Sequence, residues 1–88
     1  MSRRLVFSKP FVRDYQALPD EIKAAVDKAL GLLLANTRHP SLQTKKMQPA
    51  ARGIFEARVT QSYRMTFQVD EANVVLRRVG THDILKTP

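Results

Sequence analysis

The sequence predicts an α+β fold in which an N-terminal strand and a helical hairpin pack on one face of a mainly antiparallel four-stranded sheet. Apolar residues recur at helical spacing between residues 8 and 36. In the last third of the chain, apolar and polar residues alternate instead. The 88 residues have room for one sheet with one helical layer, so we expect a single domain over residues 1–88.

The N-terminal part of the chain predicts one strand and two helices. A short β-prone stretch at residues 4–7 indicates the strand, and Ser8 can cap the helix that follows it. The apolar stripe of this helix consists of three residues at i, i+4 and i+7, namely Phe11, Tyr15 and Leu18. Pro19 ends the helix or restarts it at a new angle, because proline has no N–H to donate to the preceding turn. A second helical pattern then runs from residue 20 to residue 36.

Residues 37–53 break the helical pattern. Pro40, Pro49 and Gly53 favour turns and extended chain. We expect a long irregular loop that contains the basic pair Lys45–Lys46. Structured loops of this length are often functional.

The last third of the chain predicts antiparallel strands. Alternating or β-rich patterns mark three of them, at residues 54–60, 63–69 and 74–79. A tight turn at Gln61–Ser62 and a polar loop at residues 70–73 connect them. This arrangement puts Arg58 and Arg64 on neighbouring strands, facing away from the helices and about 5 Å apart. Like charges this close cost free energy unless an anion binds between them.

The charge of the chain favours a polyanionic partner. Its formal net charge is +7, and between Arg38 and Arg64 there are six basic residues but a single acidic one, Glu56. Nucleic acid is the polyanion that such a surface suits best, because neutralising phosphates releases bound counterions. The alternative is a solvated basic surface that serves only solubility.

Several classes of protein are disfavoured by what the sequence lacks. There is no cysteine, and two histidines make a histidine-rich metal site improbable, so we expect neither metal nor cofactor. No apolar run approaches the ~20 residues that cross a bilayer. Residues 1–7 begin with basic side chains but have no hydrophobic stretch of signal-peptide length. We therefore expect a cytoplasmic protein with no membrane partner.

The order of short motifs along the chain resembles the RelE/ParE superfamily of bacterial type II toxins. These motifs are Leu18–Pro19, Arg38–Leu42, Gly53–Val59, Ser62–Phe67 and Arg78–Asp83. Within the last motif, Gly80-Thr81-His82 is similar to the YafQ-like branch. The resemblance implies an endoribonuclease that cuts mRNA on the ribosome and is neutralised by a cognate antitoxin. It covers essentially the whole chain.

The resemblance also implies roles for individual residues. Arg64 would contact the scissile phosphate and His82 would transfer a proton, as histidine can near neutral pH. Arg58 would stabilise the transition state or, alternatively, bridge to Glu56. The candidate RNA-binding residues are Lys45, Lys46, Arg52 and Arg78. We expect Arg77 and Arg78 to point to opposite faces, so at most one of them joins the site, and the resemblance favours Arg78.

Other interpretations stay open at this stage. Arg64 can be a surface arginine paired with Glu56 or with an antitoxin carboxylate, and His82 can be a capping histidine that bonds to Asp83 or to backbone. Lys86 stands where the YafQ-like branch has an aromatic residue, and Ser62 stands where it has an aspartate. Two other functions compete with the nuclease. One is a ParE-like DNA gyrase inhibitor or non-catalytic toxin homologue, and the other is a simple RNA-binding module.

Overall fold

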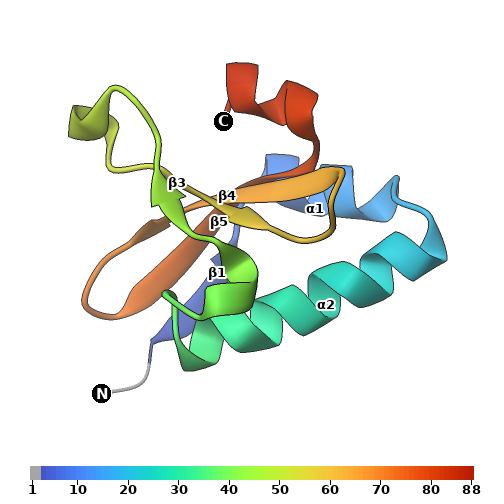
Figure 1. Ribbon diagram of the computed structural model, residues 1–88, viewed down its shortest axis with the longest axis horizontal. Coiled ribbons are helices and arrows are strands. Elements are labelled where there is room, and N and C mark those ends of the chain that lie inside the picture. Colours follow the sequence, from blue (N-terminus) through green and yellow to red (C-terminus); the bar gives the residue numbers. More distant parts are fainter. Residues whose placement is uncertain (1–2) are drawn as a thin grey trace.

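The computed structural model describes residues 3–88 and contains a five-stranded sheet with the strand order β1-β5-β4-β3-β2 (Figure 1). Met1 and Ser2, which begin the segment considered for an export signal, lie outside the described residues. β1 (Arg4–Phe7) runs parallel to β5 (Asn73–Thr81), and all other neighbouring strands are antiparallel. Figure 1 shows α2 along one side of this sheet and the C-terminal segment on the opposite side.

The two predicted helices are confirmed. They are α1 (Lys9–Gln16) and α2 (Asp20–Ala35), and Pro19 separates them. α1 begins where the Ser8 Oγ accepts a hydrogen bond from the Phe11 N–H at 3.2 Å, which satisfies one of the free N–H groups of the first turn. Within the described part of the chain, no helix has the length and apolar character needed to cross a membrane.

The predicted number of strands is wrong by one. β2 (Lys45–Lys46) pairs with the first residues of β3 (Phe55–Arg58) and adds a fifth strand at the edge. Residues 37–53 are also more ordered than expected, since they contain the 3₁₀ helices η1 (Pro40–Leu42) and η2 (Ala50–Arg52). A two-residue strand has no alternation of its own, so the sequence pattern carries no sign of it.

The hydrophobic core lies between the sheet and the helices. β4 (Tyr63–Val69) contributes Met65 and Phe67, both with no exposed surface. The Phe67 ring stacks on Phe55 of β3 with centroids 5.6 Å apart. The helices contribute the buried residues Phe11, Val26, Ala29, Leu30 and Leu33. Each large side chain of this kind stabilises the fold by about 1.5–3 kcal/mol relative to exposure.

A β-bulge interrupts the pairing of β4 with β5. The register shifts between Thr66 and Phe67, and Arg77 falls between the paired positions of β5. Because of this extra residue, Leu76 and Val79 both face the core, although strict alternation would place them on opposite sides of the sheet. The bulge therefore keeps the core continuous along β5.

A third short helix, η3 (His82–Lys86), covers part of the sheet face that is turned away from α2. Its Ile84 is buried, and it packs against Gly80 of β5. A Cβ atom at position 80 would lie 2.8 Å from Ile84 Cγ2, which is too close for ordinary contact. Glycine at this position thus sets how closely η3 approaches the sheet.

Candidate active site

Two arginines lie side by side on the sheet face opposite α2, which we call the open face. Arg58 on β3 pairs directly with Arg64 on β4, so the two residues share the facing that the sequence predicts. Opposed residues of antiparallel strands have Cα atoms about 4.5–5.5 Å apart. Among residues 3–88, no carboxylate lies within ion-pair distance of either guanidinium. The two positive charges are therefore not compensated by this part of the chain.

The β3–β4 turn holds the guanidinium of Arg64. Its Nη1 donates to three backbone carbonyl oxygens, those of Thr60 at 2.7 Å, Gln61 at 3.1 Å and Tyr63 at 3.1 Å. Its Nε and Nη2 form no hydrogen bond with the described residues, so one edge of the planar group stays available to a phosphate. An arginine fixed in this way is ordered before a ligand arrives.

His82 follows the end of β5 and is exposed as the first residue of η3. Arg64 pairs with Gly80, two residues before it. Because two residues span at most about 7 Å, the Cα atom of His82 lies within about 12 Å of the Cα atom of Arg64. The His82 side chain makes no hydrogen bond to Asp83 or to any other described residue, so the capping alternative is not the arrangement found. Its imidazole is free to approach a ligand held by Arg64.

Arg58 lies at the margin of the open face. Its Nε is buried and has no hydrogen-bond partner among the described residues. The residue also lines a cavity of about 270 Å³ with Lys28 of α2 and Ser41 of η1. The expected bridge from Arg58 to Glu56 is absent, because the carboxylate of Glu56 pairs with Lys45 at 4.0 Å instead.

The four candidate RNA-binding residues separate into two groups. Lys45 is exposed beside Glu56, and Arg52 is exposed at the end of η2 next to the open face. Lys46 alternates to the other side of the short strand, where its Nζ lies 5.5 Å from the centroid of the Phe55 ring. Of these three residues, Lys45 and Arg52 are positioned to contact a ligand on the open face, and Lys46 is not.

Arg78 is bound within the protein. Its Nε and Nη2 donate to the Asp14 carboxylate of α1 at 2.6 and 3.2 Å, and this hydrogen bonding raises the pKa of Arg78 above its ordinary value. Asp14 also accepts the Val79 N–H at 3.1 Å. The sequence preferred Arg78 over Arg77, but it is Arg77 that lines a polar pocket on the open face. The expectation that the two side chains point to opposite faces is wrong: the bulge places both on the open face, because Leu76 before them and Val79 after them both face the core, and the two arginines line one pocket together. No local sequence signal marks this bulge.

Among residues 3–88, no group of three or more His, Cys, Asp or Glu side chains is arranged to hold a metal ion.

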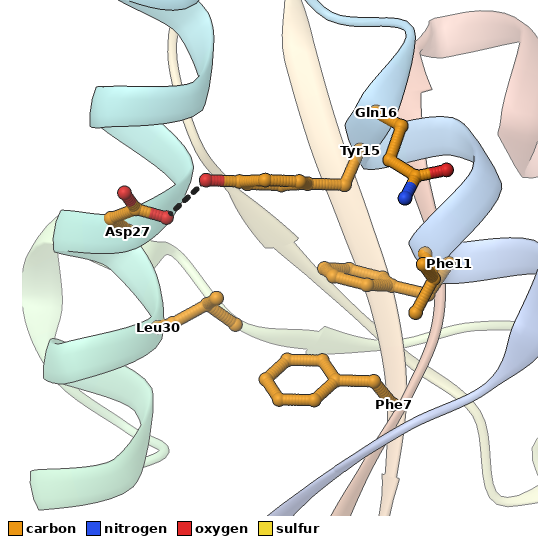
Figure 2. A pocket seen from close by; sticks show the side chains of 7 residues that line it. Phe7, Phe11, Tyr15, Gln16, Asp27 and Leu30 are labelled. Carbon is orange, nitrogen blue, oxygen red and sulfur yellow. Dashed lines mark hydrogen bonds between the residues drawn. The ribbon is translucent and has the colours of Figure 1, made fainter.

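A second, apolar pocket lies between the two helices (Figure 2). It has a volume of about 320 Å³, and Phe7, Phe11 and Leu30 form much of its wall. The Tyr15 hydroxyl donates to Asp27 Oδ1 at 2.8 Å across it, which raises the pKa of Tyr15. Phe7 is 45% exposed although it is a large apolar side chain. Exposed apolar surface next to an apolar pocket is typical of a protein-binding site.

A sequence profile of the ParE toxin of type II toxin–antitoxin systems, parDE, matches residues 5–85. A search of the curated proteins finds no match. The profile covers nearly all of the chain, which also has the sheet, helical hairpin and C-terminal segment described above. The chain belongs to the ParE toxin family of type II toxin–antitoxin systems, within the RelE/ParE superfamily.

Solved structures of related toxins share the fold. The RelBE2 toxin–antitoxin complex from Mycobacterium tuberculosis contains a chain that is 28% identical, with a TM-score of 0.76, 93% of this chain covered and 100% of that one. Escherichia coli YafQ is 20% identical, with a TM-score of 0.78 and coverage of 94% and 97%. The Escherichia coli DinJ–YafQ complex gives 19% identity, a TM-score of 0.80 and coverage of 97% and 98%.

Proposed function

We propose that this chain is a metal-independent endoribonuclease that cleaves mRNA, with the ribosome holding the substrate. The observation that carries this proposal is the juxtaposition of the Arg58–Arg64 pair with His82. Arg64 pairs with Gly80, and the exposed imidazole follows two residues later. These groups match what RNA cleavage requires, namely cations for a phosphate and a group that can move a proton.

RNA supplies its own nucleophile in this reaction. The 2′-oxygen forms a bond to the adjacent phosphorus, and the bond from phosphorus to the 5′-oxygen breaks. The products are a 2′,3′-cyclic phosphate and a free 5′-hydroxyl. The 2′-hydroxyl loses its proton and the leaving 5′-oxygen gains one; His82 transfers one of these two protons and solvent water exchanges the other. Arg64 neutralises the charge that develops on the phosphoryl oxygens through its available N–H edge.

The surrounding residues position the RNA. Arg58 lies beside Arg64 and adds positive charge to the transition state, while Lys45 and Arg52 contact the backbone. Lys46 and Arg78 keep the structural contacts described above rather than roles in RNA binding. The open face is shallow, so we assign substrate alignment to the ribosome, which converts an unfavourable encounter into an oriented one. An mRNA target places this activity in the cytoplasm.

A cognate antitoxin is the second partner that we propose. The similar chains in the RelBE2 and DinJ–YafQ structures come from toxin–antitoxin complexes. In this chain, the apolar pocket between α1 and α2 has the size to take a large apolar side chain, and the net charge of +7 favours an acidic partner. We propose an amphipathic segment with acidic residues, as either a helix or an added strand.

Inhibition of DNA gyrase is the competing function, because the matching family profile is that of the ParE toxin. The deciding experiment is primer extension on mRNA after induction of the wild type, Arg64→Ala and His82→Ala. The nuclease proposal expects cuts from the wild type and at least a hundredfold fewer from each variant. Arg13→Ala, on the exposed side of α1, is the matched control and retains full cleavage. Full toxicity of His82→Ala together with loss of DNA supercoiling would contradict the nuclease and support the gyrase inhibitor.

A further inference from the structure

A polar pocket on the open face, next to the candidate active site, has no role in the proposal so far. It has a volume of about 530 Å³. Three cationic residues from three separate elements line it, namely Arg52 of η2, Arg77 of β5 and Lys86 of η3. The pocket thus gathers positive charge from parts of the chain that are far apart in sequence.

Two hydrogen bonds hold Arg77 in this pocket. Its Nη1 donates to Gln68 Oε1 at 2.8 Å, and its Nε donates to the Pro88 carbonyl oxygen at 3.2 Å. Gln68 is itself fixed, because its Nε2 donates to the Arg52 carbonyl oxygen at 3.0 Å. The Arg77 guanidinium is therefore oriented before any ligand binds.

Arg77 has no acidic side chain as a partner among the described residues. No Asp or Glu side chain of residues 3–88 forms an ion pair with it, with Arg52 or with Lys86. The adjacent Arg78 provides the contrast, since Asp14 binds it with two charge-assisted hydrogen bonds. Three cationic side chains without an Asp or Glu partner line one polar pocket and repel each other, and an anion is a ligand that relieves this repulsion.

The position of the pocket indicates which anion it takes. Gly80 pairs with Arg64, and Arg77 lies three residues before it along β5, or about 10 Å away. Over this distance, the long side chains of Arg64 and Arg77 can reach different phosphates of one strand. A planar guanidinium also matches a phosphate oxygen pair better than a single ammonium does.

We infer that the pocket lined by Arg52, Arg77 and Lys86 binds a phosphodiester of single-stranded RNA that neighbours the scissile one, with Arg77 as the anchoring group. This inference rests on the proposed function, in which RNA crosses the open face. It adds Arg77 to the residues that contact RNA and defines a path for the RNA from Arg64 along β5.

Binding of RNA at several salt concentrations tests the inference. The probe is a fluorescent single-stranded RNA oligonucleotide with 2′-O-methyl riboses, which the chain cannot cleave. We expect Arg77→Gln to weaken binding and to lower the slope of log K against log salt by about 0.7, the value for one lost phosphate contact in a single strand. Arg77→Lys should keep the slope and lose part of the affinity. Arg13→Gln is the matched control and should change neither quantity.

The outcomes separate this inference from the nuclease proposal. An unchanged slope in Arg77→Gln, with a lowered slope in Arg64→Gln, would overturn the inference and leave the nuclease intact. A lowered slope in Arg77→Gln together with mRNA cuts by His82→Ala would support the RNA subsite and contradict the nuclease mechanism. If Arg77→Gln weakens a purified antitoxin while RNA binding is unchanged, the pocket belongs to the antitoxin interface and the inference is wrong. Circular dichroism checks that each variant is folded.

Discussion

The two faces of the sheet are built from the same strands but use their side chains in opposite ways. On the helix-facing side, Met65, Phe67 and Leu76 are fully buried and pack against each other and the helices. On the open face, Arg58 and Arg64 lie opposite one another with no carboxylate partner among the described residues. Close packing stabilises the first face by itself, whereas the second is a charged surface that becomes favourable only when an anion is bound. Stability and function are thus separable on this sheet.

The largest effect on stability is expected from the helix-facing side. Phe67→Ala removes a ring that stacks on Phe55 and has no exposed surface, so we expect a loss of about 3–5 kcal/mol in the free energy of unfolding. Urea denaturation measures it. Lys86→Ala on the open face is the matched comparison and should stay within about 0.5 kcal/mol. Equal losses at the two positions would break the distinction between the faces.

A smaller effect is expected where α1 meets β5. Asp14→Ala removes the carboxylate that binds Arg78 and the Val79 N–H, and it leaves a half-buried guanidinium without its partner. We expect a loss of about 1.5–3 kcal/mol in the free energy of unfolding. Arg77→Ala, one residue along β5, removes no ion pair and should cost clearly less in the same assay. A larger loss from Arg77→Ala would show that the structural and functional roles of the two arginines are reversed.

The contact between Gly80 and η3 links the open face to stability. Gly80→Ala brings a methyl group against Ile84 Cγ2, so we expect η3 to shift, a loss of about 1–3 kcal/mol and reduced mRNA cleavage because His82 moves with η3. Amide hydrogen exchange in η3 reports the shift. Gly31→Ala is the matched control, because a Cβ there meets nothing within 4 Å and the helix gains about 0.5–1 kcal/mol. Unchanged exchange in η3 would contradict this account.

The smallest effect on stability is expected in the turn that connects β4 to β5, two strands that contribute side chains to both faces of the sheet. Asp70 Oδ1 accepts hydrogen bonds from the N–H groups of Ala72 and Asn73, and these lower the pKa of Asp70 in the folded chain. A lowered folded-state pKa means that the carboxylate stabilises the fold at neutral pH and that this contribution disappears as the pH falls through that pKa. Asp70→Asn should therefore be slightly less stable than the wild type at pH 7. The difference between their urea midpoints should shrink toward about pH 2, and a constant difference would argue against the assignment.

Much of the fold was predictable because periodicity is a local property. The helical stripe ending before Pro19 and the alternation in residues 63–69 each identify an element without knowledge of its neighbours. The common facing of Arg58 and Arg64 followed from the alternation of two neighbouring strands, whereas their direct pairing depends on a connection longer than the expected two-residue turn. Where a few residues determine the geometry, the sequence was sufficient.

The features that the sequence did not reveal depend on distant contacts. β2 is defined only by its pairing with β3. The bulge at Arg77 is needed because Leu76 and Val79 both pack in the core, which regular alternation along β5 does not allow. The binding of Arg78 by Asp14 joins residues 64 positions apart. Charge and motif order had no means of separating Arg77 from Arg78, because that difference arises from packing rather than from residue type.

The central position of β5 affects how the chain folds during synthesis. β1 is synthesised before the other strands of the sheet but pairs only with β5, so it has no strand to join until residues 73–76 have been made. The same strand also carries Gly80 and leads directly into His82. A nascent chain that stops short of β5 therefore lacks both a closed sheet and the imidazole. During synthesis of the full sequence, the sheet and the proposed catalytic surface are therefore completed together, once β5 and His82 have been made.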